Sequence, residues 1–182
     1  MINHWIISDT HFRHGAIYSF LGLDGQRIRH QFKDVAEGDA FMIQAWNDIV
    51  KPEDHIWHLG DFCMGSPQSW IDIGRRLHGH KRIIPGNHDR VGAQTYASAG
   101  FQKLCGAKEW KIGGLRLLCT HYPVHESSLF NRDASIHGHT HEKEPPTLRH
   151  YNVSVERIGY KPMHVEELAK IVKERLLIYG KE

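Results

Sequence analysis

The chain has 182 residues, of which 40% are hydrophobic and 24% charged, and its formal net charge is +2. One domain over residues 1–182 is the expectation for this length, and the composition is typical of a soluble globular protein. A net charge this close to zero excludes the strong basic field that attracts long nucleic acids or acidic membranes, but it does not exclude small charged ligands.

Short apolar runs alternate with helical patterns in the first half of the chain. Runs of this length bounded by Gly or Pro are typical of buried strands. Ser66-Pro67 marks the start of one helix, because serine caps a helix N-terminus and proline fits its first turn. The expected elements are strands at 2–8, 54–59 and 81–85 and helices near 34–50, 66–79 and 91–99.

The second half of the chain has mainly strand patterns. Gly113-Gly114 separates two apolar runs, at 109–112 and 115–120, and predicts a hairpin with a two-residue turn. This half closes with a helical pattern whose apolar residues recur on one face. The whole order fits two facing sheets that are flanked by helices. The further elements expected are strands at 134–137 and 151–155 and a helix near 164–178.

Five of the apolar runs stop on side chains that bind metals. In open α/β sheets, sites form beyond the carboxyl ends of the strands, so these side chains are expected to meet at one edge. Oxygen and imidazole donors without thiolate suit divalent ions, and the donors are too many for one ion. A metal-dependent hydrolase is therefore the leading interpretation. The segments that follow the runs are Asp9-Thr10-His11, Gly60-Asp61, Gly86-Asn87-His88-Asp89, His121 and Gly138-His139-Thr140-His141.

Each of these segments taken alone also has an ordinary explanation. An aspartate such as Asp61 after a glycine is also a usual helix cap. Gly86-Asn87 is ordinary turn chemistry, and many of the 16 histidines are expected to be solvated or core side chains. The combination favours function, because every one of the segments also ends an apolar strand.

Taken in this order, the five segments resemble the motifs of the calcineurin-like metallophosphoesterase superfamily, which are DxH, GD, GNH[DE], H and GHxH. The resemblance covers residues 9–141, and every motif is intact. It implies an α/β fold of four layers, an α-β-β-α sandwich in which helices flank two facing mixed sheets. Among its members, the chain is most similar to the small single-domain bacterial, archaeal and phage type. The resemblance also implies an enzyme that hydrolyses phosphate esters by a metal-activated hydroxide at a binuclear centre.

By motif position, the resemblance implies two sets of metal ligands that share Asp61. It makes His88 the group that protonates the leaving oxygen or stabilises the transition state, with Asp89 orienting its ring. The cofactors expected are two divalent ions, Mn²⁺, Fe, Zn²⁺ or Ni²⁺, of which Mn²⁺ is favoured. The first set is Asp9, His11, Asp61 and His141, and the second is Asp61, Asn87, His121 and His139.

One departure from the family pattern bears on the substrate. Protein serine/threonine phosphatases of this superfamily carry an arginine in a GDxVDRG run, and the segment 60–65 has none. This argues against phosphoprotein phosphatase activity of that type. The chain is also too short for an added cap domain, so an open site is expected. Candidates for substrate contact are Arg13 and His14, with solvated loop residues as the equal alternative, and then His125, Arg132 and His137.

Small phosphodiesters or phosphomonoesters are the expected substrates. A nuclease or a cyclic-nucleotide phosphodiesterase is the alternative, and a non-catalytic scaffold is less favoured because every predicted ligand is present. The three cysteines form no CxxC pair, and Asp9 interrupts the apolar start of the chain. A cytoplasmic protein without a membrane partner is therefore expected. Monoester or diester preference, the metals bound in the cell and the oligomeric state stay open.

Overall fold

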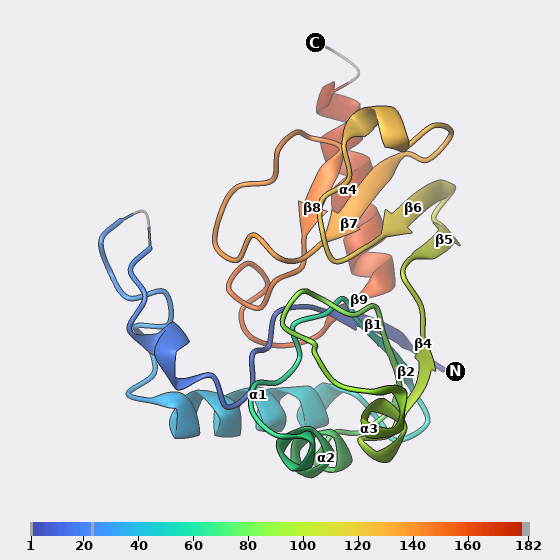
Figure 1. Ribbon diagram of the computed structural model, residues 1–182. Helices are drawn as coiled ribbons and strands as arrows, with labels where there is room; N and C mark the ends of the chain where they lie inside the picture. The colour runs from blue at the N-terminus through green and yellow to red at the C-terminus, as the bar shows by residue number, and fades with distance from the viewer. Residues whose placement is uncertain (1, 23, 180–182) are drawn as a thin grey trace.

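Two mixed β-sheets face each other in the computed structural model, which describes residues 2–22 and 24–179 (Figure 1). In the first sheet, ordered β4-β3-β2-β1-β9, β1 to β4 are parallel and β9 is antiparallel to β1. In the second, ordered β5-β6-β7-β8, only β5 runs antiparallel to its neighbour. The strands are β1 (His4–Ile7), β2 (His55–His58), β3 (His80–Ile83), β4 (Phe101–Leu104), β5 (Lys108–Ile112), β6 (Leu115–Cys119), β7 (Ala134–His137), β8 (His150–Asn152) and β9 (Met163–His164).

Helices cover the outer faces of both sheets. Three of them lie beneath the first sheet in the view of Figure 1, and α4 lies against the second sheet. The layers therefore run helix, sheet, sheet, helix, and the α-β-β-α sandwich expected from the sequence is confirmed. The helices are α1 (Val35–Ile49), α2 (Pro67–Arg76), α3 (Ala93–Ser98) and α4 (Val165–Tyr179), with the 3-10 helices η1 (Gly15–Tyr18) and η2 (Glu126–Ser128) in connecting loops.

One continuous hydrophobic core joins the layers. Trp46 of α1 and Trp70 of α2 are each 1% exposed, and they belong to the same packed cluster as Leu117 and Ile136 of the second sheet. Burial of apolar surface is the dominant favourable term in folding, so this shared core fixes the position of one sheet against the other. The relative placement of the strand ends, which carry the functional side chains, follows from it.

The segment 150–155 connects the two sheets directly. It begins as β8 in the second sheet, and beyond Asn152 it hydrogen-bonds to Ser8 at the end of β1. Ser8 N donates to Val153 O at 3.0 Å, and Val155 N donates to Ser8 O at 3.1 Å. The strand expected at 151–155 is therefore shorter than predicted, because its second half pairs with the other sheet.

Two strands of the first sheet have no clear sequence pattern. β4 buries only Phe101 and lies at the sheet edge, and β9 has two residues that pair with β1. A strand this short or this exposed shows no alternation of apolar and polar residues, which is the signal that predicts strands. The other strands and the helices lie within a few residues of their predicted positions.

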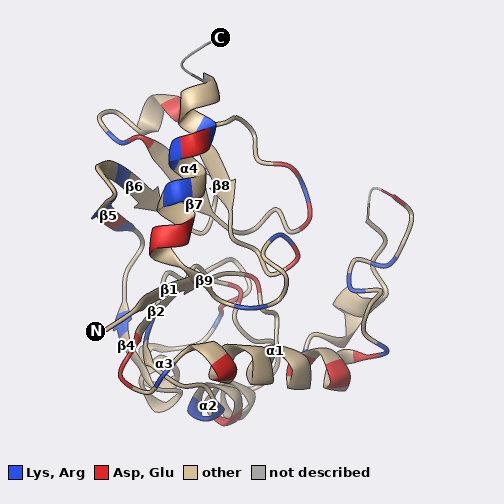
Figure 2. Cartoon of the chain, turned by 180° about the vertical axis from the view of Figure 1, so that it is seen from behind, with Lys and Arg blue, Asp and Glu red and all other residues tan. Residues whose placement is uncertain are grey.

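Charges of both signs are interspersed on the surface. Figure 2 shows basic and acidic residues alternating along α4, and acidic residues along α1. Among residues 2–22 and 24–179, the structure contains no helix with the length and apolar character that crossing a bilayer requires.

Candidate metal centre

The predicted ligands converge where the parallel strands of the two sheets end. Asp9 and His11 follow β1, and Asp61 follows β2, while His139 follows β7 of the second sheet. Beyond the strands the backbone continues the pairing, because Asp9 N donates to Gly60 O and Gly138 N donates to His121 O, both at 3.0 Å. The loops therefore hold their side chains at one shared edge, as expected for an open α/β sheet.

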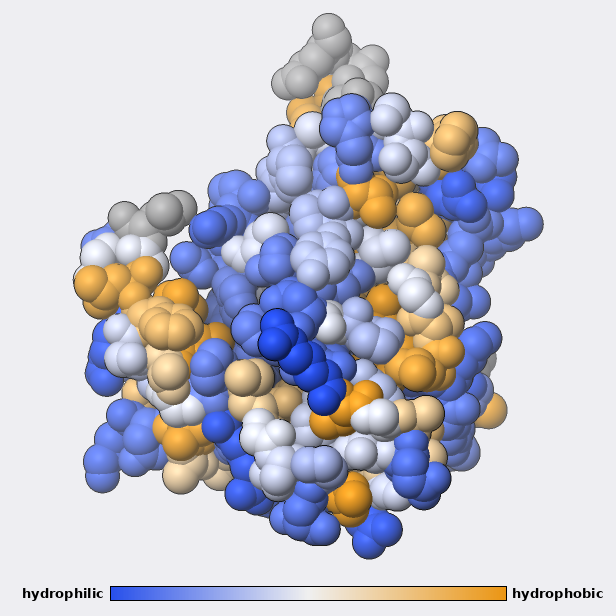
Figure 3. Space-filling model, viewed as in Figure 1, coloured by the Kyte–Doolittle hydropathy of each residue, from blue (hydrophilic) through white to orange (hydrophobic). Residues whose placement is uncertain are grey.

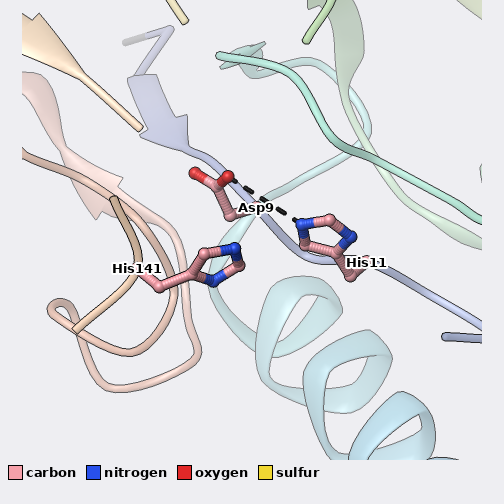
Figure 4. Close-up of side chains that lie close together, drawn as sticks. All are labelled: Asp9, His11 and His141. Atoms are coloured by element: carbon pink, nitrogen blue, oxygen red, sulfur yellow. Dashed lines mark ion pairs between the residues drawn. The ribbon is translucent and has the colours of Figure 1, made fainter. Parts of the chain in front are cut away.

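A first group of three ligands comes from both sheets. Asp9, His11 and His141 each present one ligand atom, and these atoms lie within 4.8 Å of one another. Figure 4 shows the rings of His11 and His141 near the carboxylate of Asp9, and the two rings are stacked with their centroids 5.1 Å apart. His11 Nε2 lies 4.0 Å from Asp9 Oδ1.

A second group lies beside the first. Asp61, His121 and His139 present ligand atoms that also lie within 4.8 Å of one another. The amide oxygen of Asn87 joins them, because Asn87 Oδ1 lies 3.0 Å from His121 Nε2. The structure thus brings together the residues of both predicted ligand sets.

The carboxylate of Asp61 lies between the two groups. Its Oδ2 atom is 3.6 Å from His11 Nε2 of the first group and 3.4 Å from His121 Nε2 of the second. Its other oxygen, Oδ1, accepts the backbone N–H of His88 at 2.8 Å. One oxygen is therefore fixed by the backbone, and the other faces both groups.

The unpaired atoms of the cluster fit cation binding. Among the described residues, both ring nitrogens of His11 are buried without a hydrogen-bond partner, which is costly for polar atoms. Burial lowers the pKa of His11 to about 2, so its ring is the neutral form that binds metals. His121 Nδ1 donates to Leu59 O at 2.8 Å, and this hydrogen bond leaves Nε2 facing the site. These atoms and the neighbouring carboxylates form a donor set that one or more divalent ions would satisfy.

Five of the predicted ligands have an unusual backbone conformation. A positive φ is uncommon outside glycine and costs on the order of 1–3 kcal/mol where the surroundings impose it. Such residues concentrate at functional sites, and aspartate and histidine tolerate this region better than most others. The sequence motifs carry no sign of this strain. The φ angles are 58° for Asp9, 45° for His11, 55° for Asp61, 68° for His139 and 50° for His141.

Two motif glycines are required by close packing against the ligands. A Cβ atom at Gly86 would lie 2.2 Å from Asp61 Oδ1, and one at Gly138 would lie 2.2 Å from Asp9 Oδ2. Real Cβ atoms essentially never approach other heavy atoms within 3.0 Å. Gly86 and Gly138 therefore allow their loops to approach the carboxylates of Asp61 and Asp9. This explains why glycine precedes Asn87 and His139 in the motifs.

A buried histidine of β2 connects two of the ligand loops. His58 Nδ1 accepts the N–H of Gly60 at 3.1 Å, and its Nε2 therefore carries the proton that points to Thr10 Oγ1 at 3.0 Å. The hydroxyl of Thr10 in turn donates to Phe62 O at 2.8 Å. His58 is thus a buried strand residue whose ring hydrogen-bonds to both the DxH and the GD segments.

His88 and Asp89 differ in their surroundings. The ring of His88 is exposed, and its centroid lies 5.3 Å from that of His11, at the open side of the first group. The carboxylate of Asp89 accepts backbone N–H groups from Gly86, Asp61 and Phe62 at 2.8–2.9 Å. No hydrogen bond joins it to the ring of His88 among the described residues. The oxygens of Asp89 close the turn against the end of β2, and its expected role in orienting the ring of His88 stays a prediction.

The two candidates past the first motif have different surroundings. The ring of His14 lies 5.2 Å from that of His11 and 6.4 Å from that of His88, which places it beside the first group. Arg13 instead lines a cavity with side chains of α1 and α2, and its backbone N–H donates to Asp39. Only His14 has a ring contact with a predicted ligand.

The weaker candidates have structural partners. His125 caps η2, and Arg132 donates to Glu109 at 2.8 Å. His137 is buried and donates through Nδ1 to Gly138 O. Burial raises the pKa of Cys63 to about 12, which disfavours the thiolate that a metal would require.

Several residues near the ligands were not identified from the sequence. Ser154 Oγ donates to Asp9 Oδ2 at 2.9 Å, and the half-exposed ring of Tyr122 lies 4.5 Å from that of His139. Arg29 donates to the carbonyl oxygens of Asp9 and Thr10. The sequence gives a signal only for Tyr122, which is adjacent to the predicted ligand His121. It gives none for Ser154 or Arg29.

Comparisons with known proteins agree with the motifs. A family model described as the calcineurin-like phosphoesterase superfamily domain matches residues 2–153. The gene 66 protein of Mycobacterium phage L5 is 38% identical over 171 residues, and 78% of each chain is covered. An uncharacterised protein of Methanocaldococcus jannaschii is 27% identical over 93% of this chain and 91% of its own length. A crystal structure of an Aquifex aeolicus protein of unknown function superposes with a TM-score of 0.74 at 26% identity, over 94% of this chain and all of that one.

Proposed function

Because the chain belongs to the calcineurin-like phosphoesterase superfamily, we propose that it hydrolyses small phosphodiesters or phosphomonoesters with two bound divalent ions. One observation carries this proposal above the others. Asp61 Oδ2 lies 3.6 Å and 3.4 Å from imidazole nitrogens of two separate ligand groups, which is the position of a bridging ligand. A single ion would leave one of these groups without a function.

The donor chemistry of the cluster supports a binuclear centre. Asp9, His11 and His141 would hold one ion, Asn87, His121 and His139 the other, and Asp61 both. Two ions held by these residues would supply a nucleophilic hydroxide at neutral pH and would neutralise the charge of the phosphate oxygens. The mixed oxygen and nitrogen donors suit Mn²⁺, Fe, Zn²⁺ or Ni²⁺, and we favour Mn²⁺.

The side chains around the ligands have separate tasks in this proposal. The exposed ring of His88 stands at the open side of the first group, where it can give a proton to the leaving oxygen. The backbone N–H of His88 holds Asp61 Oδ1, so one residue connects the bridging ligand to the proton donor. Asp89 fixes this turn through three backbone hydrogen bonds. His14 lies close enough to His11 and His88 to contact the phosphate.

The surface around the site supports a small substrate. Figure 3 shows hydrophilic side chains in the middle of the visible face and hydrophobic patches on both sides, including one over the arm formed by residues 15–22 and 24–33. Exposed Phe20 and Leu21 belong to this arm. Interspersed charges of both signs do not form the basic stripe that tracks a long nucleic acid.

Metal content and rates on a defined substrate panel test the proposal. Metal-stripped protein is titrated with Mn²⁺, and elemental analysis is expected to find two ions per chain. Asp61→Asn should weaken both sites, whereas His121→Ala should weaken only one. One ion in the wild-type protein, or unchanged metal content in both variants, would refute the ligand assignment. The panel contains phosphomonoesters, phosphodiesters, cyclic nucleotides and single-stranded oligonucleotides, so that the highest kcat/KM identifies the substrate class.

A further inference from the structure

A buried ion pair lies beneath the first group of ligands. Arg29 is 0% exposed and the side chain of Glu156 is 2% exposed. Arg29 Nε and Nη2 both donate to Glu156 Oε1, at 3.0 Å and 2.9 Å. The two residues are 127 positions apart in the sequence, and neither belongs to a motif of the metal centre.

The second oxygen of Glu156 faces a predicted metal ligand. Glu156 Oε2 lies 3.3 Å from Nδ1 of His141. Among the described residues, both atoms are buried and neither has a hydrogen-bond partner, so this contact at 3.3 Å is the polar contact that the structure gives them. The carboxylate therefore divides its oxygens, with Oε1 for the guanidinium and Oε2 for the imidazole.

The guanidinium of Arg29 also supports the first motif. Its Nη2 donates to the carbonyl oxygen of Asp9 at 2.8 Å, and its Nη1 donates to that of Thr10 at 2.9 Å. Asp9 has a φ of 58°, so its carbonyl is held in a conformation that needs support from its surroundings. Arg29 and Glu156 thus contact two residues of the same predicted ligand set.

A purely structural role explains these contacts less well. A buried ion pair is weak support for a fold, because desolvating two charges offsets much of their attraction, and apolar residues of similar volume often serve equally well. The pair would also have no reason to direct Oε2 at a ring nitrogen that is otherwise unpaired. Metal-binding histidines commonly donate their other ring N–H to a carboxylate, which fixes the tautomer and orients the ring.

We propose that Glu156 is a positioning residue for His141 and that Arg29 holds it in place. Glu156 Oε2 accepts the Nδ1–H of His141, so that Nε2 of the same ring, which faces Asp9 in Figure 4, is the atom presented to the ion. The inference rests on the proposed metal centre, and it concerns only the ion held by Asp9, His11 and His141. It assigns no contact with the substrate to either residue.

The test compares Glu156→Gln with two reference variants. Glutamine keeps the size of the side chain but removes the carboxylate that accepts from His141 and neutralises Arg29. Asp54→Asn is the matched control, because Asp54 is also buried but lies at the opposite end of β2 from Asp61. His141→Ala defines the full loss of the ligand. Affinity for each of the two ions is measured by competition of Zn²⁺ and Co²⁺ with a chelator, and the Co²⁺ absorption spectrum reports the geometry of each site.

We expect Glu156→Gln to lower the binding affinity for one of the two ions about 10- to 100-fold and to leave the affinity for the other unchanged. One set of Co²⁺ absorption bands should change. Asp54→Asn should leave both affinities at the wild-type level. Wild-type metal affinity in Glu156→Gln, or an equal loss of affinity in Asp54→Asn, would overturn the inference. The proposed metal centre would still be supported in that case if His141→Ala lost one ion. Two ions bound at wild-type affinity in His141→Ala would overturn both the inference and the ligand assignment.

A measurement on the wild-type protein keeps the inference testable if Glu156→Gln does not fold. In ¹⁵N-labelled protein loaded with Zn²⁺, NMR should find the exchange-protected ring proton of His141 on Nδ1. His141→Ala identifies the signal. A proton on Nε2, or a ring N–H that exchanges with water as fast as an exposed histidine, would overturn the proposed hydrogen bond.

Discussion

Gly138→Ala is expected to damage the candidate metal centre although it replaces none of the predicted ligands. A Cβ atom at this position would lie 2.0 Å from Ser8 Oγ and 2.2 Å from Asp9 Oδ2. Ordinary van der Waals contacts begin at 3.4 Å, so both atoms would have to retreat by over an ångström.

Neither atom has space for that retreat. Ser8 and Asp9 are 0% exposed, and Asp9 Oδ2 already accepts from the N–H of His139 and from Ser154 Oγ, both at 2.9 Å. Forcing an extra methyl group into a packed interior typically costs about 1–3 kcal/mol of stability. Displacing a group by ~1 Å near the chemistry can lower the rate ~10²-fold.

The variant should therefore retain one ion tightly and lose the other, with kcat reduced about 100-fold or more. Elemental analysis after dialysis, kcat on the preferred substrate and urea unfolding measure the three effects. Gly106→Ala is the matched control, because nothing lies within 4 Å of its added Cβ, and it should behave as the wild type. Two ions and a wild-type rate in Gly138→Ala would show that the carboxylate of Asp9 is not held as the structure indicates.

Three further predictions concern other parts of the chain. His88→Ala should lower kcat about 10²–10⁴-fold and retain both proposed ions, because the exposed ring is the proposed proton donor to the leaving oxygen; elemental analysis that finds an ion missing would contradict this. Hydrogen bonds from Asn3, Trp5 and Lys51 outweigh burial and lower the pKa of Asp54 from 3.8 to about 2. Its contribution of about 2 kcal/mol should be complete above pH 4 and lost as the pH falls through 2, so urea unfolding should find Asp54→Asn less stable at pH 7 and much closer to the wild type near pH 2. Phe130→Gly should stabilise the fold by roughly 0.5–1 kcal/mol, because Phe130 has a φ of 49° and is 84% exposed; a lower Tm would refute the assumption that its ring contributes little.

The residues of the candidate metal centre could be predicted from the sequence because metal-binding residue types and strand ends coincide in every motif. Asp9, Asp61 and His139 each follow an apolar run that the structure confirms as a strand. Strand ends on the same edge of a sheet converge, so side chains far apart in the sequence could be expected to meet. The hairpin over Gly113-Gly114 and the capped start of α2 were accessible for similar reasons, since short-range turn and cap chemistry determines them.

Contacts that depend on tertiary structure alone were not accessible. Arg29 and Glu156 stand in segments without a motif, and their pairing depends on how the arm packs against the loop between β8 and β9, where Tyr160 also contacts Arg29 and Phe32. The partners of Asp89 depend on the return of its turn to the end of β2, which no local pattern encodes. The positive φ angles of the ligands are likewise imposed by the convergence of the strands, because aspartate and histidine usually adopt negative values.

The mixed origin of each ligand group has a consequence for synthesis of the chain. The first group gains its last member, His141, only after the 140 residues that precede it in this sequence have been made. Contacts over such distances form late, because the entropy of closing the loop has to be overcome first. A nascent chain on the ribosome therefore carries only scattered donors of Asp9, His11, Asp61 and Asn87. The proposed hydrolytic activity should therefore arise in one step, with the completed fold.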